Sequence, residues 1–343
     1  MAQFTDNLLL THGIRPIVTL TIWLLWSLSS WLWIDLPALA VNNPCPQGMI
    51  LIPGGTLKMG TDNSVFVEET PSKNVTVDSF CMDKYEVTNA EFAKFVIATG
   101  YITVAELPLS KEQFPDLTEQ QRSPGSLVFK MPRQGEIPFL SWWHWLPGAN
   151  WQHPLGNNSE ILGKENYPVV HIAYQDALAF ADWLGKSLPT EAQWEYAARG
   201  GLEDATYTWG NKYSETKANT WQGIFPFLNT KVDGYVGLAP VGSFQANGYG
   251  LYDMAGNVWE WTVDWFTVED KHSVNQVSEY EISKTRKSFD PNKPTETLLH
   301  VIKGGSYLCA PNYCSRYRPA ARESQAPDTG TNHIGLRLVK NLY

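Results

Sequence analysis

The sequence predicts a loop-rich domain in which short strands and a few helices are joined by long irregular segments. Short apolar and β-branched runs alternate with glycine-rich turns, and only three stretches carry a helical pattern. Two segments, 106–166 and 207–266, are irregular and rich in Pro, Gly and Trp, and loops of such length are usually functional. The 15 Trp, 15 Tyr and 14 Phe supply large anchors for such a fold.

Length and charge narrow the class of protein. At 343 residues the chain can bury a large core, in one domain or two. Its net charge of −9 gives no indication of a nucleic-acid-binding surface, so we expect no nucleic-acid partner.

The first forty residues predict export. The apolar run Ile17–Leu36 ends just before Ala38-Leu39-Ala40, the small-x-small pattern of a signal-peptide cleavage site. The run is also just long enough to span a bilayer, although Asp35 near its end disfavours a span. We expect residues 1–40 to be a signal peptide or, failing cleavage, a membrane anchor. Residues 41–343 then form a secreted or periplasmic body.

Strand-like runs follow at Met49–Pro53, at 55–60 and at Val75–Cys81. An exported chain can hold disulfides. Cys45 lies just before the first run and Cys81 ends the last one. We therefore expect a Cys45–Cys81 disulfide between neighbouring strands.

Two capping boxes mark helix starts. Thr88-Asn-Ala-Glu91 opens a helix that should end at Gly100, and Thr190-Glu-Ala-Gln193 opens another that should stop at Gly200-Gly201. Between them, Tyr174–Gly185 carries an apolar stripe at helical spacing.

The helix after Thr190 contains both apolar and acidic residues. We expect Trp194 and Ala198 to be buried. Glu191 and Glu195 could pair with Arg199, but surface charge is the favoured interpretation.

A pair of thiols stands out near the C-terminus. In the segment Val301–Arg322 a β-branched strand breaks at Gly304-Gly305 and leads to Cys309 and Cys314. Two thiols at this spacing can hold one soft metal ion or form a short-loop disulfide, and the residues alone favour neither. The pair does not make a zinc site by itself, because zinc takes about four ligands and no second Cys/His pair lies nearby in the sequence. His144 and His153 in the long loop have no partner spacing for a metal site.

Oxygen-bearing side chains recur in the glycine-rich turns of 207–266. Asn219, Asp233, Asp253 and Glu260 could serve Ca2+, which takes carboxylate, amide and carbonyl oxygens together. Turn-forming roles explain the same positions nearly as well.

Five stretches resemble the sulfatase-modifying-factor family: GMILIPGGTLKMG, DKYEVTNAEFAKFV, YPVVHIAYQDALAFADWLGKSLPTEAQWEYAARGG, NGYGLYDMAGNVWEWT and VIKGGSY…GLRL. The similarity runs from Gly48 to Val339 and implies a loop-rich α+β fold, a single domain related to C-type lectins. Many members share this framework without the oxidase chemistry. The stretch GGSYLCAPNYCSRYR is similar to the formylglycine-generating members of the family.

That resemblance implies an oxidase. Formylglycine-generating members use O2 and one copper ion to convert a cysteine in a Cys-x-Pro-x-Arg motif of a sulfatase polypeptide to Cα-formylglycine. By position, Cys309 and Cys314 match the Cu(I) ligands, Ser306 a pocket residue beside them and Trp259 an active-site aromatic. The resemblance further implies a monomer.

The resemblance also implies two structural Ca2+ sites that hold long loops. The first would use the side chains of Asn219 and Asp233 with the carbonyls of Thr220 and Tyr235. The second would use the side chains of Asp253 and Glu260 with the carbonyls of Gly256 and Val258.

Departures from the family pattern concern stability more than the thiol loop. Ala181, Pro319 and Leu338 stand where vertebrate members have disulfide cysteines, and Cys45–Cys81 has no counterpart in those members. Within the loop, Ala310-Pro311-Asn312 replaces a more basic stretch.

Two rival functions are compatible with the same framework. One is a lectin-like binding module in which Cys309 and Cys314 form a disulfide. The other is an iron-dependent sulfoxide-type synthase, which would need a His-rich iron site that the sequence does not show.

Overall fold

The computed structural model describes residues 44–112, 114–132, 142–267 and 299–342. By its internal contacts the chain divides into residues 1–42 and 43–343. The predicted signal peptide or anchor lies outside the described residues and stays a prediction. Within the described ranges, no helix has the length and apolar character needed to cross a bilayer.

The strands of the described residues are short, as predicted, and the helices are few. They are β1 (Met49–Ile52), β2 (Gly55–Met59), β3 (Lys73–Val77), β4 (Phe80–Asp83), α1 (Asn89–Thr99), β5 (Gly125–Phe129), β6 (Trp143–Pro147), α3 (Tyr174–Trp183), α4 (Glu191–Arg199), β7 (Gly223–Ile224), β8 (Leu228–Asn229), β9 (Trp259–Trp265), β10 (His300–Lys303), β11 (Glu323–Gln325), β12 (Ile334–Gly335) and β13 (Val339–Asn341), with 3-10 turns at Val67–Glu69 and Val104–Glu106.

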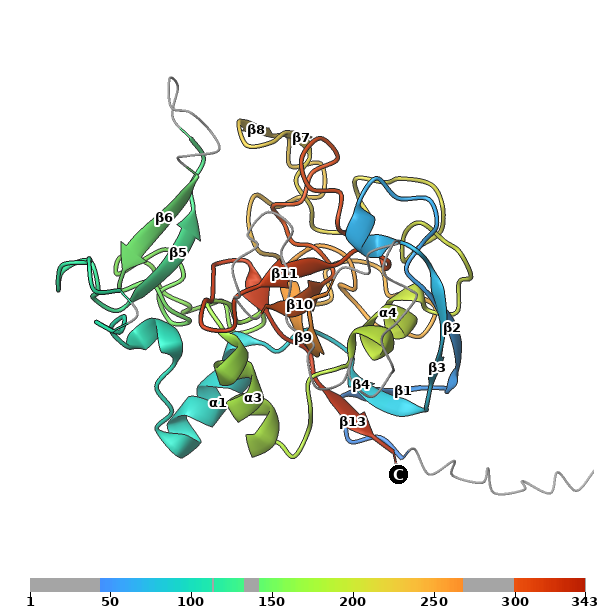
Figure 1. Ribbon diagram of the computed structural model, residues 1–343, viewed down its shortest axis with the longest axis horizontal. Coiled ribbons are helices and arrows are strands. Elements are labelled where there is room, and N and C mark those ends of the chain that lie inside the picture. Colours follow the sequence, from blue (N-terminus) through green and yellow to red (C-terminus); the bar gives the residue numbers. More distant parts are fainter. Residues whose placement is uncertain (1–43, 113, 133–141, 268–298, 343) are drawn as a thin grey trace, which may run out of the picture. The chain divides into compact units, whose positions relative to one another are not determined.

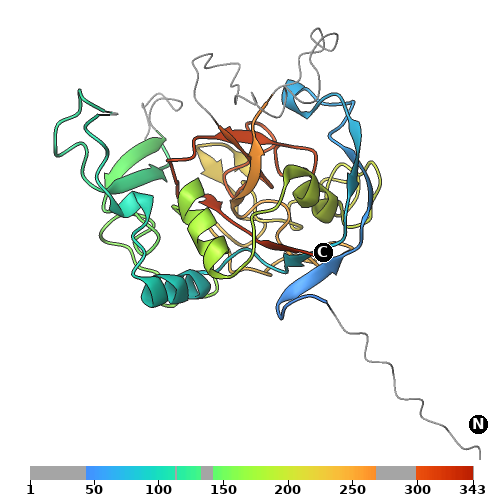
Figure 2. The same ribbon diagram turned by 60° about the horizontal axis from the view of Figure 1, so that its bottom comes forward.

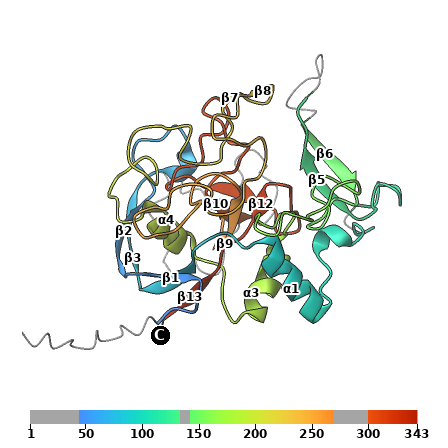
Figure 3. The same ribbon diagram turned by 180° about the vertical axis from the view of Figure 1, so that it is seen from behind.

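A four-stranded sheet lies at the centre, in the order β11-β10-β9-β12. Figure 3 shows it between α4 on one side and the pair α1 and α3 on the other. β10 pairs antiparallel with both β9 and β11, whereas β12 runs parallel to β9. All four residues of β10 are buried. The mixture of sheets and separate helices is the α+β, C-type-lectin-like architecture that the sequence predicts.

A second sheet joins the two ends of the described chain, in the order β1-β4-β13 (Figure 1). In its register Leu51 lies opposite Cys81. The predicted disulfide is present: Cys45 and Cys81 are bonded, with their Cα atoms 5.5 Å apart.

Three two-stranded hairpins extend from this framework: β2–β3, β5–β6 and β7–β8. In Figure 2 the blue strands β2 and β3 and the green hairpin β5–β6 lie at opposite sides of the central strands. The predicted strand Val75–Cys81 is wrong in one respect. The chain leaves β3 after Val77 and re-enters at Phe80, because its two halves pair with different partners, β2 and β1.

The helices begin and end where the local signals place them. Thr88 and Glu91 form a reciprocal capping box at α1, and Gly100 ends the helix in the left-handed conformation at φ 69°. Thr190 and Gln193 form a second reciprocal capping box at α4. Gly200 ends that helix, also in the left-handed conformation, at φ 58°. α3 stops at Trp183, slightly before the predicted end.

The predicted surface position of Glu191 and Glu195 is wrong. Both side chains are buried, as are Trp194 and Ala198, whose burial was predicted. Lys303 of β10 is fully buried and lies 3.1 Å from the Glu195 carboxylate and 3.6 Å from that of Glu191. The alternative interpretation is confirmed for Glu195, which also pairs with Arg199 of the same helix at 2.7 Å. The carboxylates can be buried here because cations pair with them.

Candidate active site

The thiol loop begins directly where β10 ends. Gly304 and Gly305 follow the strand at φ 94° and 73°, a region that side chains disfavour. A Cβ on Gly305 would lie 2.9 Å from the backbone of Tyr317, and one on Gly304 would lie 3.0 Å from the Trp194 ring. Glycine at both positions lets the chain turn tightly against its neighbours and enter the loop.

Cys309 and Cys314 face each other across one turn of this loop. Their Sγ atoms are 2.6 Å apart, and no disulfide joins them in the structure. The Cys309 N–H donates to the Ser306 carbonyl and the Cys314 N–H to the Ala310 carbonyl, each at 2.9 Å. The loop therefore brings the two sulfurs together, as either a shared soft metal ion or a disulfide would require.

The two thiols differ in their electrostatic environment. Burial, together with the neighbouring sulfur of Cys314, raises the pKa of Cys309 well above its usual value. The hydrogen bond from Cys309 lowers the pKa of Cys314, and the N–H and charge of Arg316 lower it further. Cys314 is thus the sulfur that most readily carries a negative charge, with Cys309 as its hydrogen-bond donor.

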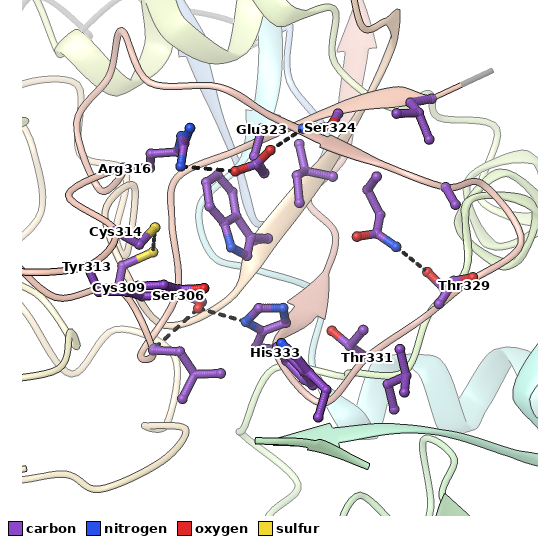
Figure 4. Close-up of a pocket in the computed structure, with 18 of the residues that line it drawn as sticks. Ser306, Cys309, Tyr313, Cys314, Arg316, Glu323, Ser324, Thr329, Thr331 and His333 are labelled. Carbon is purple, nitrogen blue, oxygen red and sulfur yellow. Dashed lines mark hydrogen bonds and ion pairs between the residues drawn. The ribbon is translucent and has the colours of Figure 1, made fainter. Parts of the chain in front are cut away.

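Arg316 is fixed beside the thiols by two carboxylates. Its guanidinium lies 2.6 Å from the Glu68 carboxylate and 3.1 Å from that of Glu323. Figure 4 shows Arg316 and Glu323 on the same side of the pocket as Cys314. The pairing holds a positive charge near the sulfurs in a defined place.

Ser306 meets a histidine that the sequence analysis did not identify. Ser306 is fully buried, and its Oγ lies 3.0 Å from Nδ1 of His333 while accepting a hydrogen bond from the Leu308 N–H at 3.2 Å. Burial lowers the pKa of His333 to about 3, with His171 adding to the effect, so the imidazole is neutral at neutral pH. Their separation of 27 residues explains why sequence reasoning missed the pair.

These groups line one pocket of about 570 Å³ (Figure 4). Trp259, on β9, also lines it, so the structure brings together all four residues proposed for the chemistry. The lining residues are Leu127, Trp143, Phe225, Trp259, Leu299, Ile302, Ser306, Leu308, Cys309, Tyr313, Cys314, Arg316, Glu323, Ser324, Gln325, Ala326, Thr329, Thr331 and His333.

Aromatic side chains from three segments meet at the rim of this pocket. Tyr313 stacks on Phe225 with ring centroids 4.3 Å apart, and Trp142 lies 5.3 Å from each of them. Sequence analysis identified none of the three as site residues, because they become neighbours only when the loops fold together.

Three of the four residues proposed for the first Ca2+ site lie around one carboxylate, that of Asp233, and the amide of the fourth, Asn219, points elsewhere. Asp233 accepts hydrogen bonds from the N–H groups of Thr220 at 3.1 Å and Tyr235 at 2.9 Å. The amide of Gln222 donates to Asp233 at 2.8 Å and also to the Thr220 carbonyl. The Asn219 amide instead donates to Gly237 and Asn257. Oxygens therefore converge on the position of the Gln222 amide, which fits a hard cation.

The second proposed Ca2+ site is an acidic cluster around one guanidinium. Both oxygens of Glu260 accept hydrogen bonds from Arg337, and one also accepts from Trp194 at 2.7 Å. Burial raises the pKa of Asp253 to about 6, with Glu260 contributing. Gly256 and Val258 are buried on the connection between these two carboxylates.

Glu86 joins this cluster, although sequence analysis did not identify it. Burial and the charge of Asp253 raise its pKa well above the usual value. Its Oε1 is buried, and none of the described residues hydrogen-bonds to it. The Arg337 guanidinium thus faces three buried carboxyl groups, those of Glu86, Asp253 and Glu260. A bound cation would offset the negative charge that this one guanidinium leaves unbalanced. Side chains alone do not complete a site: in the described residues no group of three or more His, Cys, Asp or Glu is placed to hold a metal ion.

Comparison with known proteins identifies similar chains. The model of the sulfatase-modifying factor enzyme 1-like domain matches residues 37–342. The formylglycine-generating enzyme of Mycobacterium tuberculosis is 47% identical over 297 residues, which are 85% of this chain and 97% of that protein. The enzyme of the same name from Mus musculus is 45% identical over 296 residues, 85% of this chain and 74% of that one.

More distant relatives include a protein without the activity. The inactive C-alpha-formylglycine-generating enzyme 2 of Mus musculus is 33% identical over 322 residues, covering 93% of this chain and 92% of that one. Among solved structures, PvdO from Pseudomonas aeruginosa superposes with a TM-score of 0.55 at 25% identity, covering 86% of this chain and 94% of its own.

Proposed function

The chain belongs to the sulfatase-modifying factor family, and on that basis we propose that it is a formylglycine-generating enzyme. Its substrate would be a cysteine in a Cys-x-Pro-x-Arg motif of a sulfatase polypeptide, oxidised to Cα-formylglycine with O2. The observation that carries the proposal is the convergence of the Cys309 and Cys314 sulfurs, 2.6 Å apart, at a pocket that Ser306 and Trp259 also line.

The donor set of the pocket fits Cu(I). Two convergent sulfurs are what a soft monovalent ion prefers, and a substrate thiolate could join them from the open side. Cys314, the more acidic thiol, would lose its proton first, and Arg316 offsets negative charge beside it. Copper, when bound, would supply the redox chemistry with O2.

The remaining residues of the pocket would position the substrate. Ser306 presents a hydroxyl beside the sulfurs, and His333 fixes its direction. Trp259 and Trp143 form apolar walls that exclude water from the reacting sulfur. Tyr313, Phe225 and Trp142 form a rim against which an extended peptide can lie.

Calcium would have a structural role, that of holding long loops in place. Two observations support it: oxygens converge near Asp233, and three buried carboxyl groups lie together around Asp253. Both clusters stand where long loops meet, and neither lines the pocket. Export of residues 41–343, and the fate of residues 1–40, remain expectations from the sequence.

A binding module without chemistry is the alternative function. The inactive relative shows that the framework alone does not guarantee activity. The higher identity to formylglycine-generating enzymes, 47% against 33% for the inactive relative, favours the enzyme.

The test is to titrate Cu(I) into the reduced protein while following peptide oxidation by mass spectrometry. Cys309→Ser and Cys314→Ser should each abolish tight copper binding and conversion of a Cys-x-Pro-x-Arg peptide to the aldehyde. Both should leave the fold intact, because the pair closes only a short loop. Ser315→Ala, beside Cys314 but outside the pocket lining, is the matched control and should behave as wild type.

Two outcomes would contradict the proposal. Tight one-to-one copper binding that survives either cysteine substitution would remove the thiol pair as the copper site. No aldehyde from copper-loaded wild type with any Cys-x-Pro-x-Arg peptide would favour the binding module.

A further inference from the structure

The β7–β8 hairpin presents large apolar side chains to solvent. Ile224, Phe227 and Leu228 are 59%, 53% and 52% exposed. Ile224 and Leu228 are directly paired in the hairpin, so their side chains lie on the same face. A contiguous exposed apolar surface on a folded protein commonly marks a binding site.

The hairpin is fastened to the thiol loop. The Trp221 N–H donates to the Cys309 carbonyl at 3.0 Å, and the Trp221 indole donates to the Leu228 carbonyl at 2.9 Å. The Phe225 N–H donates to the Asn312 side chain at 3.4 Å. The tip is therefore held in a fixed position relative to the sulfurs.

The hairpin also packs against an exposed residue of the pocket. Tyr313 lines the pocket, is 51% exposed and stacks on Phe225, which is buried between it and the hairpin. A peptide whose cysteine enters the pocket beside Tyr313 would lie along this rim. Its neighbouring residues would then pass close to Ile224, Phe227 and Leu228.

We propose that the exposed tip of the β7–β8 hairpin binds an apolar stretch of the polypeptide substrate that flanks the reactive cysteine. This inference rests on the proposed function and adds a specificity element to it. An unfolded polypeptide exposes apolar side chains that a folded protein buries. The hairpin would thereby favour substrates that have not yet folded.

The charge of this region favours a peptide over a membrane surface. Membrane-binding apolar segments are usually flanked by several basic residues that contact anionic lipids. Lys231 is the only basic residue in the segment 221–236, and the chain as a whole carries a net charge of −9.

The test compares two peptides that share the Cys-x-Pro-x-Arg motif and differ in their flanks. One has Leu and Phe at the flanking positions and the other has Ser and Thr. Binding is measured by fluorescence anisotropy on versions with Ser in place of the reactive cysteine, and turnover on the cysteine versions. The hairpin variant is Ile224→Thr/Phe227→Ser/Leu228→Thr. The control is Ile97→Thr/Leu162→Ser, which changes side chains that are 84% and 81% exposed and do not line the pocket.

Wild type and control should bind the peptide with Leu and Phe flanks about tenfold more tightly than the peptide with Ser and Thr flanks. This is the difference expected for burying a few half-exposed side chains. The hairpin variant should bind both peptides alike. In turnover the preference should appear in KM and not in kcat.

Equal binding of both peptides by wild type would overturn the inference, as would a preference that persists in the hairpin variant. Binding of wild type but not the variant to phosphatidylglycerol vesicles, without a peptide preference, would assign the hairpin to a membrane. Concentration-dependent dimerisation lost in the variant, again without a peptide preference, would assign it to a second copy. If the cysteine peptides are not oxidised but the binding preference follows the hairpin, the inference holds and the proposed oxidation fails.

Discussion

His333 illustrates how a single buried residue can act through a neighbour. With its pKa lowered to about 3 by burial, the imidazole carries no charge at neutral pH. It is therefore a positioning residue for the Ser306 hydroxyl, 3.0 Å away, rather than a source of protons.

We expect His333→Phe to lower kcat for peptide oxidation by up to about tenfold, the worth of one lost hydrogen bond, and to leave Cu(I) affinity unchanged. His333→Asn should restore most of the rate, because its amide can still contact Ser306. Parallel kinetics and copper titrations check this. A Phe variant with wild-type kcat would remove the positioning role, and a loss of copper affinity would indicate a structural one.

His171 makes stability depend on pH. Its ring is fully buried, with Nδ1 2.8 Å from the Ser126 hydroxyl and Nε2 2.9 Å from the Pro154 carbonyl. Burial lowers its pKa from 6.5 to about 4, so between these values the unfolded chain binds a proton that the folded chain does not. The free energy of unfolding must fall as pH drops through this window, by about 3 kcal/mol in all.

We expect His171→Gln to remove this dependence, so the stability advantage of wild type over the variant should shrink from pH 7 to pH 4. The quantity to follow is the free energy of unfolding of wild type minus that of the variant at each pH. Burial raises the pKa values of Asp176 and Asp253 to about 6, and these groups change stability with pH in the opposite direction in both proteins. Denaturant unfolding at several pH values measures it. A constant difference would show that His171 is not the group responsible.

At the scale of elements, the sheet β1-β4-β13 is crosslinked by a disulfide near the N-terminal end of the described chain. Cys45 precedes β1 and Cys81 lies in β4, with a sequence separation of 36 residues. The bond restricts the unfolded chain over this loop.

Removal of the disulfide in Cys45→Ala/Cys81→Ala should lower the free energy of unfolding by ~2–4 kcal/mol, as loop-closure entropy predicts. Copper binding should be unaffected, because neither cysteine lines the pocket. Denaturant unfolding of oxidised wild type, reduced wild type and the variant provides the measurement. Equal stability of all three would show that the bond does not constrain the unfolded chain.

At the scale of the whole molecule, long loops are joined by the two oxygen-rich clusters around Asp233 and Asp253. We expect Ca2+ to raise the Tm of wild type, since an ion that binds only the folded state stabilises it. Asp253→Ala should reduce this increase, because a carboxylate of the second site is lost. Scanning calorimetry with and without Ca2+ measures it, with Asp328→Ala, an exposed carboxylate outside both clusters, as the control. Equal stabilisation of the Asp253 variant and wild type would remove the second site.

Local signals in the sequence were sufficient for the helix starts and the Cys45–Cys81 disulfide, but not for β5 to β9, which lie in segments predicted to be irregular. Capping boxes at Thr88 and Thr190 act within a few residues, so they predict helix starts without knowledge of the fold. The same holds for the thiol loop: a strand, two glycines and Cys309 with Cys314 are contiguous in the chain. Family resemblance then implied the fold class and which residues share the pocket.

Only the tertiary structure decided which distant groups meet. Glu195 pairs with Arg199 of its own helix, but its burial also depends on Lys303, a buried cation 108 residues away. Ser306 gains His333 across 27 residues, and Glu260 gains Arg337 across 77. Ion pairs and hydrogen bonds between remote segments depend on how the loops pack, and a short sequence window contains no information about that packing.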